Sequence, residues 1–148
     1  MILKMLPEQI PTIWVAIKLA VVRSCEVPEA RIPEVSQRLL HALMASRMVC
    51  FVRLEEPSRM ILSLLILEGI MNRYTGRKEL TVIGFYSFKK LSDDDAREAH
   101  QLMCAVARDL DCERLYSTAS FQRSWSISEA MGWTEASRNY AFDMKGGA

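Results

Sequence analysis

The fold is decided between residues 79 and 119, which read ELTVIGFYSFKKLSDDDAREAHQLMCAVARDLDCERLYSTA. Residues 79–88 are rich in β-branched and aromatic side chains and predict a strand. Ser92 is a good helix N-cap, Asp95 follows it as in a capping box, and apolar residues then recur at helical spacing. Residues 114–119 predict another short strand. This strand–helix–strand order favours an α/β sheet with helices packed on it.

The rest of the chain adds elements on both sides of this core. Apolar residues at helical spacing predict a helix over 8–24 and a second over 33–45, with Pro33 in its first turn. Apolar runs bounded by turn signals predict strands over 48–54 and 60–70, the second of them buried on both faces. A short helix over 122–131 and a last strand over 140–144 complete the order ααβββαβαβ. We expect one domain over 1–148, with 145–148 as a loose tail.

Composition excludes several classes of function. The chain has 148 residues, with 19 Lys plus Arg against 18 Asp plus Glu, so we expect no broad nucleic-acid surface. The 4 cysteines have no Cys-x-x-Cys spacing and the 2 histidines cannot form a cluster alone, so no metal is expected. The apolar stretch over 10–22 contains Lys18 and is too short to span a membrane. We expect a cytoplasmic protein.

Several short motifs follow one another in the second half of the chain, and their order and spacing are informative together. A strand over 81–88 is followed by the long helix to Asp111, the strand Glu113-Arg-Leu-Tyr-Ser117 and the Gly132-Trp133 step. Together they resemble the GNAT superfamily of N-acetyltransferases, which often has a Gly-Phe or Gly-Trp step at this place. The resemblance covers most of the chain and is strongest over 80–144. It implies a mixed, mostly antiparallel central sheet flanked by helices, and acetyl-CoA as the cofactor.

Two segments also resemble the small GNAT-like proteins that tailed phages encode. They are Ile10-Pro-Thr-Ile-Trp14 and Phe85-Tyr-Ser-Phe-Lys-Lys-Leu-Ser92. This second resemblance implies a partner protein from a bacterial host or from the virion, and a location in the host cytoplasm or the virion.

The pyrophosphate loop of the family is altered in this chain. In the family, a Gln/Arg-x-x-Gly-x-Gly/Ala loop at the start of the long helix directs backbone N–H groups at the pyrophosphate. The matching residues here are Leu91-Ser-Asp-Asp-Asp-Ala96, with no glycine and three carboxylates. A like-charge pair about 4 Å apart costs about 4 kcal/mol at an effective dielectric near 20. The simplest interpretation of Ser92 and the aspartates is a helix cap, so we expect weak or absent binding of acetyl-CoA.

The resemblance still implies a set of cofactor-binding positions. The pantetheine of acetyl-CoA adds like a strand between two splayed strands, and this needs no particular side chain. Gly84 either marks a bulge that splays them or packs against a helix. Lys89, Lys90 and Arg97 either offset the acidic charge or form a solvated basic face. The implied cofactor-binding residues are Phe85, Tyr86, Ser87, Phe88, Lys89, Lys90, Ser92 and Arg97.

The residues at the family's catalytic positions match the family pattern poorly. Many family members have a tyrosine on the short helix that protonates the departing thiolate of CoA, and the matching residue here is Ser128. A serine hydroxyl is a far weaker acid than a phenol, so Ser128 is a poor substitute. Glu68 and Tyr86 are the other acid–base candidates, although Glu68 also suits an ordinary carboxylate at a strand end.

Two functions therefore remain open. The first is an acetyltransferase or acyl-CoA-binding protein with a divergent phosphate loop. The second is a non-catalytic GNAT-like module that binds a host protein or belongs to a phage particle. The fold does not decide between them. The deciding feature is whether basic side chains replace the lost glycine cradle around Ser92.

Overall fold

The structure, a computed structural model, describes residues 1–117 and 128–144. The chain divides into two compact units, residues 1–118 and 119–148, and each is described by itself. The single domain expected over 1–148 stays a prediction. The end of the predicted strand over 114–119, most of the predicted helix over 122–131 and the predicted loose tail over 145–148 lie outside the described residues.

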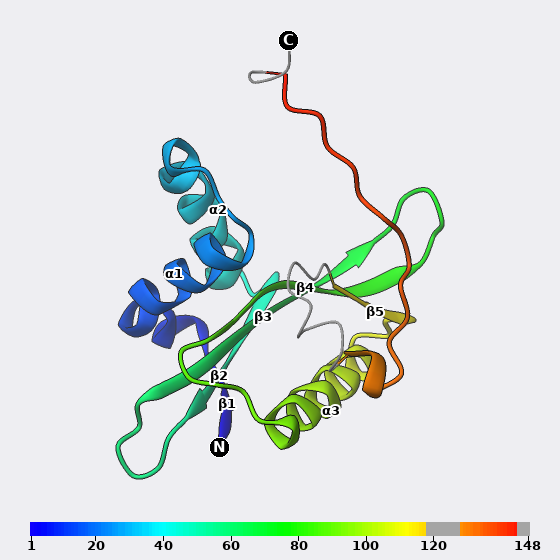
Figure 1. Cartoon of the computed structure of the whole chain (residues 1–148). Coiled ribbons are helices and arrows are strands. Elements are labelled where there is room, and N and C mark those ends of the chain that lie inside the picture. Colours follow the sequence, from blue (N-terminus) through cyan, green and yellow to red (C-terminus); the bar gives the residue numbers. More distant parts are fainter. Residues whose placement is uncertain (118–127, 145–148) are drawn as a thin grey trace. The chain divides into compact units, whose positions relative to one another are not determined.

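The first unit is built on a five-stranded sheet with the order β1-β2-β3-β4-β5 (Figure 1). The strands are β1 (Ile2–Lys4), β2 (Met48–Leu54), β3 (Ile61–Met71), β4 (Lys78–Ser87) and β5 (Arg114–Tyr116). The first four strands pair antiparallel in sequence order, and β5 pairs parallel to β4. This mixed, mostly antiparallel sheet with flanking helices confirms the predicted fold class.

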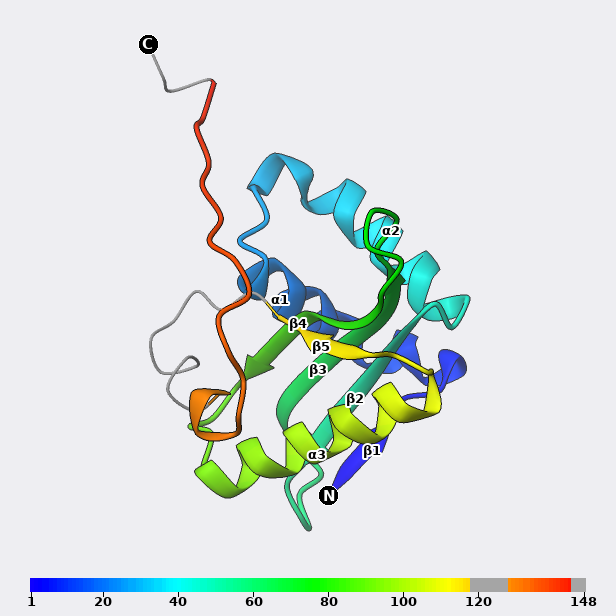
Figure 2. The ribbon, with the colours of Figure 1, turned by 90° about the vertical axis from the view of Figure 1, so that its right-hand side faces the viewer.

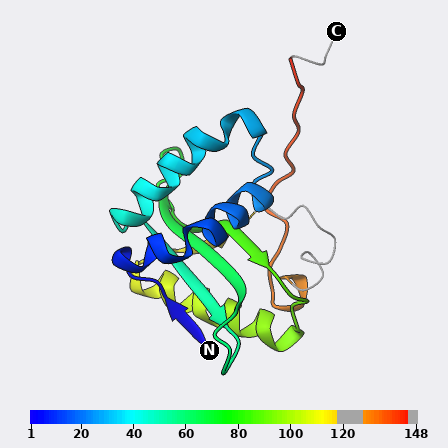
Figure 3. The same cartoon turned by 90° about the vertical axis from the view of Figure 1, so that its left-hand side faces the viewer.

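Helices cover both faces of the sheet. The helices α1 (Trp14–Ser24) and α2 (Ile32–Met44) lie on one face, as Figure 3 shows, and α3 (Asp93–Asp109) lies on the other (Figure 2). Each face has its own apolar core: Leu64 and Ile66 of β3 pack toward α1 and α2, whereas Leu65 and Leu67 pack toward α3. The central part of β3 is therefore buried on both faces, as its continuous apolar run predicts.

The start of α3 confirms the predicted cap. The Ser92 hydroxyl accepts a hydrogen bond from the Asp95 N–H at 3.0 Å, and the Ser92 N–H donates to Asp95 Oδ2 at 3.3 Å. These two bonds form a reciprocal capping box. One first-turn N–H group of α3 is thus already used by the chain itself.

The N-terminal region differs from the prediction. The expected single helix over 8–24 is a 3-10 helix, η1 (Pro7–Ile13), followed by α1. Pro11 lies inside η1 and has no N–H to donate, which disfavours a continuous α-helix there. The sequence analysis also missed β1, which pairs with β2 through Ile2, Leu3 and Lys4, and the short 3-10 helix η2 (Glu29–Arg31) before α2.

In the second unit the predicted last strand is absent. Residues 133–143 have no regular secondary structure, so the strand expected over 140–144 is wrong. Tyr140 and Phe142 alternate as in a strand, but a strand needs a hydrogen-bonded partner, and the described part of this unit offers none. Residues 128–130 form a helical turn that ends at Gly132, whose φ of +92° is readily adopted by glycine.

Candidate functional site

A bulge interrupts β4 in the middle of the sheet. Ile66 of β3 lies opposite Gly84, whereas Leu67 lies opposite Val82, so Ile83 is the extra residue. A Cβ atom on Gly84 would lie 3.4 Å from Val21 Cγ2 of α1. Gly84 therefore fits both interpretations: it lies in a bulge of β4, and it packs against the helix α1.

Past the bulge, β4 has an open edge. β5 pairs with β4 only at Glu79, Leu80 and Thr81. Within residues 1–117 and 128–144, the rest of β4 has no strand partner on that side. Phe88 N donates to Leu62 O at 2.8 Å, and backbone groups alternate sides along an antiparallel ladder, so Phe85 and Ser87 direct their N–H and C=O groups at the open edge. We call this stretch, Ile83–Ser87, the open edge.

The end of α1 already contacts two carbonyls of the open edge. The Ser24 hydroxyl donates to Phe85 O at 2.8 Å, and the Cys25 thiol donates to Ile83 O at 3.1 Å. Cys25 is the exposed cysteine among the chain's four free ones. Sequence reasoning missed both contacts, because a Ser-Cys pair at a helix end gives no signal for a strand about 60 residues away.

The side chains of the open edge point to opposite faces. Phe85 packs in the core beneath α3, and Tyr86 packs in the core beneath α1 and α2. The Tyr86 and Phe88 rings meet edge to face, with centroids 5.0 Å apart. The aromatic rings therefore fix the strand in the sheet, and its backbone is what remains for a ligand.

Two of the three predicted basic residues already have acidic partners. Lys89 Nζ lies 3.1 Å from Glu55 Oε1 on the loop after β2, and Arg97 Nη1 lies 3.2 Å from Asp94 Oδ1. The Lys89 hydrogen bond lowers the pKa of Glu55. Lys90 is exposed and makes no ion pair in the part of the chain that the structure describes. The loop before α3 thus keeps only one uncommitted cation.

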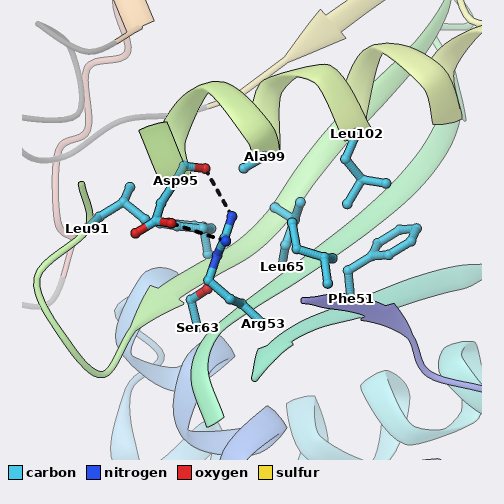
Figure 4. A pocket seen from close by; sticks show the side chains of 10 residues that line it. Phe51, Arg53, Ser63, Leu65, Leu91, Asp95, Ala99 and Leu102 are labelled. Atoms are coloured by element: carbon cyan, nitrogen blue, oxygen red, sulfur yellow. Dashed lines mark hydrogen bonds and ion pairs between the residues drawn. The ribbon is translucent and has the colours of Figure 1, made fainter. Parts of the chain in front are cut away.

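A largely buried arginine that sequence reasoning missed holds the start of α3. Arg53 of β2 points at Asp95, as Figure 4 shows, and its side chain is only 10% exposed. Its guanidinium lies 3.1 Å from Asp95 Oδ1, 2.9 Å from Glu98 Oε2 and 3.2 Å from the Asp95 carbonyl oxygen. The pKa of Asp95 is lowered, first by the Ser92 hydrogen bond and further by Arg53. We call these contacts the Arg53 clamp.

The space beside the Arg53 clamp is small. It measures about 20 Å³, which holds about one water molecule and no substrate. Its lining is mostly apolar and comes from the sheet and α3, with Phe85 of the open edge, Leu91 and Ser63 among the residues. The clamp therefore organises the helix start and does not itself form a ligand pocket.

Two of the three predicted catalytic residues, Glu68 and Tyr86, lie apart within the first unit. Glu68 and Tyr86 lie on the same face of the sheet, but Tyr86 pairs with Leu64, four residues from Glu68 on β3. At about 3.3 Å per residue this is roughly 13 Å. Glu68 instead lies opposite Thr81, beside a buried Glu79. Ser128 lies in the helical turn of the second unit.

In residues 1–117 and 128–144, no group of three or more His, Cys, Asp or Glu side chains could hold a metal ion. No helix within the same ranges is long and apolar enough to cross a bilayer.

Comparison with known proteins gives a clear likeness in structure and none in sequence. No protein-family model matches the chain, and no curated protein matches it. A predicted acetyltransferase from Clostridium acetobutylicum, solved with acetyl-CoA, has a TM-score of 0.76 at 12% identity, covering 98% of this chain and 96% of that one. An aminoglycoside 6'-N-acetyltransferase from Acinetobacter baumannii has a TM-score of 0.71 at 15% identity, covering 97% and 96%.

A third neighbour has a different acceptor. A ribosomal-protein-alanine N-acetyltransferase from Brucella melitensis biovar Abortus 2308 has a TM-score of 0.67 at 10% identity, covering 97% of this chain and 98% of that one. All three likenesses lie far below the identity at which function transfers, so they speak for the fold alone. With its mixed sheet, its bulged β4 and its flanking helices, the chain has the GNAT fold of these acetyltransferases.

Proposed function

We propose that this chain binds an acyl-CoA, with acetyl-CoA as the first candidate, by laying the pantetheine arm along the open edge of β4. The observation that carries the proposal is the open edge itself, where Phe85 and Ser87 offer backbone groups just past a bulge. Pantetheine has two amide groups, and an extended chain with amides can add to a sheet edge as a strand does. The acetyl-CoA bound to one structural neighbour supports this choice of ligand.

The residues fit the pantetheine better than the pyrophosphate. The edge is bounded by Phe85 and Tyr86, whose rings are fixed in the two cores, so its backbone is rigid before any ligand arrives. The start of α3 offers first-turn N–H groups and the helix dipole, which favour an anion. The same turn, however, carries Asp93 and Asp94, which repel one. We therefore expect weak binding, carried mainly by the pantetheine.

Local charge reduces this repulsion without removing it. Arg53 faces Asp95, and Arg97 faces Asp94, so two of the three aspartates have a cation within about 3.2 Å. Lys90 remains available to a phosphate at this turn. The repulsion is consequently smaller than bare carboxylates would give, because Arg97 offsets Asp94, and Arg53 offsets one charge of the two carboxylates, Asp95 and Glu98, that share it.

The same residues are poorer as a catalyst than as a binding site. Among the predicted residues, a donor to the departing thiolate would come from Ser128, a weak acid, or from Tyr86, which is held beneath α1 and α2. Glu68, the candidate base, lies four residues along β3 from the residue that pairs with Tyr86. We expect acetyl transfer to be slow even where acetyl-CoA binds.

Calorimetric titration of the purified protein with acetyl-CoA tests the proposal. We expect weak binding by the wild type and tighter binding by Asp94→Gly, which removes an exposed carboxylate and adds a glycine at the phosphate turn. Asp109→Gly, at the other end of α3, is the matched control and should leave the affinity unchanged. If the wild type and Asp94→Gly both give no heat while circular dichroism confirms folded protein, acyl-CoA binding is rejected.

The second candidate is a non-catalytic module that binds a protein from a host cell or a virion. The acidic start of α3 favours it, because Ser92 and Asp95 already serve the helix end that a pyrophosphate would need. If the titration gives no heat, capture of a partner by immobilised wild-type protein, followed by mass spectrometry, is the next experiment. A partner that immobilised Asp94→Gly also retains is not held merely by the negative charge of Asp94.

A further inference from the structure

The end of α1 is attached to the part of β4 that a ligand would use. Ser24, the last residue of α1, and Cys25, its C-cap, donate side-chain hydrogen bonds to Phe85 O and Ile83 O. The helix ends there because Glu26 takes a φ of +51°, in the left-handed region that turns the chain away. Two consecutive side chains thus reach the strand from one helix end.

Neither carbonyl takes part in the regular backbone hydrogen bonding between β3 and β4. Phe85 directs its carbonyl away from β3, since Phe88 N bonds to Leu62 O and the pattern alternates. Ile83 is the extra residue of the bulge and has no partner in the register of β3. Both oxygens therefore belong to the open edge, and Ser24 and Cys25 donate to them.

Gly84 lies directly against the attached end of α1. A Cβ on this residue would lie 3.4 Å from Val21 Cγ2, 3.7 Å from Val21 Cα and 3.9 Å from Ser24 Cβ. The backbone of α1 can therefore approach β4 closely enough for a serine hydroxyl to reach a strand carbonyl at 2.8 Å. The bulge, the glycine and the donor pair act on the same five residues of β4.

We propose that Ser24 and Cys25 form a latch, two side-chain hydrogen bonds that compete with an acyl-CoA for the carbonyl acceptors of the open edge. The inference rests on the proposed function, because it concerns the same edge. Pantetheine amides pairing with this strand would need Phe85 O as an acceptor, and the Ser24 hydroxyl already occupies one of the two lone pairs of that oxygen. Each ligand amide then gains only the difference between its own hydrogen bond and that of the latch.

The latch lowers affinity by an amount that a substitution can recover. A neutral hydrogen bond gives about a two- to tenfold change in an equilibrium, and a thiol is a weaker donor than a hydroxyl. Ser24→Ala should therefore bind acetyl-CoA about two- to tenfold more tightly than the wild type. Cys25→Ala should gain less, and the double variant should gain more than either one.

The experiment is calorimetric titration of wild type, Ser24→Ala, Cys25→Ala and the double variant with acetyl-CoA. Ser24→Thr keeps the hydroxyl and should bind as the wild type does. Ser36→Ala is the matched control, because its hydroxyl lies buried on the neighbouring helix α2 and makes no hydrogen bond with the described residues. Thermal unfolding of each variant shows whether α1 remains folded.

A gain in affinity is a result that mere structural damage does not produce. Tighter binding by Ser24→Ala, with Ser24→Thr and Ser36→Ala unchanged, supports the latch. Equal or weaker binding by folded Ser24→Ala overturns the latch and leaves acyl-CoA binding intact. If none of the proteins binds acetyl-CoA, the proposed function fails, and the latch fails with it because the edge has no such ligand to exclude.

Discussion

Two helix ends are attached to the sheet of the first unit, the start of α3 by ionic contacts and the end of α1 by neutral hydrogen bonds. The start of α3 is fixed to β2 by the Arg53 clamp, in which one buried guanidinium makes ionic contacts with Asp95 and Glu98. The end of α1 is fixed to β4 by the latch, two neutral hydrogen bonds to backbone carbonyls. Charge-assisted contacts of this kind are roughly twice as strong as neutral ones.

This difference in bond strength suits a fixed start of α3 and an end of α1 that can move. A ligand at the start of α3 needs first-turn N–H groups in a fixed position, and the clamp supplies that position from the end of β2. A ligand on the open edge needs the end of α1 to yield, and two weak bonds allow it to do so. Each prediction below alters one side of this comparison, from the largest expected effect to the smallest.

Removing the clamp should cost the most stability. We expect Arg53→Met to lower the free energy of unfolding by about 2–3 kcal/mol, because it leaves Asp95 and Glu98 without their cation while keeping the apolar stem. The two carboxylates are 35% and 51% exposed, so the loss should stay below that of a fully buried pair. Urea unfolding followed by circular dichroism measures it.

An exposed arginine on the same helix provides the control. Arg97 pairs with Asp94 at 3.2 Å, but its side chain is 66% exposed, so Arg97→Met should cost less than about 0.5 kcal/mol. Hydrogen exchange should also quicken at the first turn of α3 in Arg53→Met and remain unchanged in Arg97→Met. Equal losses in the two variants would contradict the distinction between a clamp and a surface pair.

Filling the glycine beneath α1 should have a moderate effect. In Gly84→Ala the new Cβ meets Val21 Cγ2 at 3.4 Å, an ordinary contact, so stability should change by less than about 0.5 kcal/mol. Gly84→Val adds two further methyl groups in the same space and should cost about 1–2 kcal/mol by overpacking. Urea unfolding of both variants tests this, and equal stability of the two would show that α1 does not approach β4 closely.

Much of this fold follows from local sequence signals. The strand over 48–54 matches β2 residue for residue, the capping box at Ser92 starts α3 where its sequence predicts, and β3 is buried on both faces as its apolar run indicates. In each case the signal and the structure occupy the same few residues. Capping and hydrophobic periodicity act at short range, so they can be read without knowledge of the tertiary structure.

What sequence reasoning missed depends on distant contacts. Arg53 lies in the apolar run MVCFVRL, where a charge is unusual, but only the folded chain brings α3 over it. The three residues of β1 form a strand because β2 is beside them, and no local pattern marks them. The converse error is the strand expected over 140–144, where a good local pattern lacks a partner in the described part of its unit. The resemblance to known acetyltransferases pointed to the edge of β4, but not to the side chains that cover it.

The smallest expected effect is the pH dependence of the stability that Asp95 contributes at the start of α3. The pKa of Asp95 is lowered in the folded state, chiefly by its hydrogen bond with Ser92, so the charged carboxylate contributes stability above the unfolded pKa near 3.9. This contribution is lost as the pH falls through the lower folded pKa. We expect Asp95→Asn to be less stable than the wild type by up to about 1 kcal/mol at pH 7, because the amide keeps an acceptor for the cap but loses the charge facing Arg53.

Urea unfolding of both proteins from pH 7 to pH 2 tests this prediction. The difference in unfolding free energy should stay constant down to about pH 4 and then shrink toward zero, since protonation makes the wild-type carboxyl resemble the amide. Asp93→Asn, one of the other first-turn carboxylates, is the control for a general effect of charge on the helix dipole. If the stability difference for Asp95→Asn is the same at pH 2 as at pH 7, or if Asp93→Asn reproduces its full pH dependence, the Asp95 carboxylate has no specific part in the clamp. Glu98 and the Asp95 carbonyl oxygen then hold Arg53 to α3.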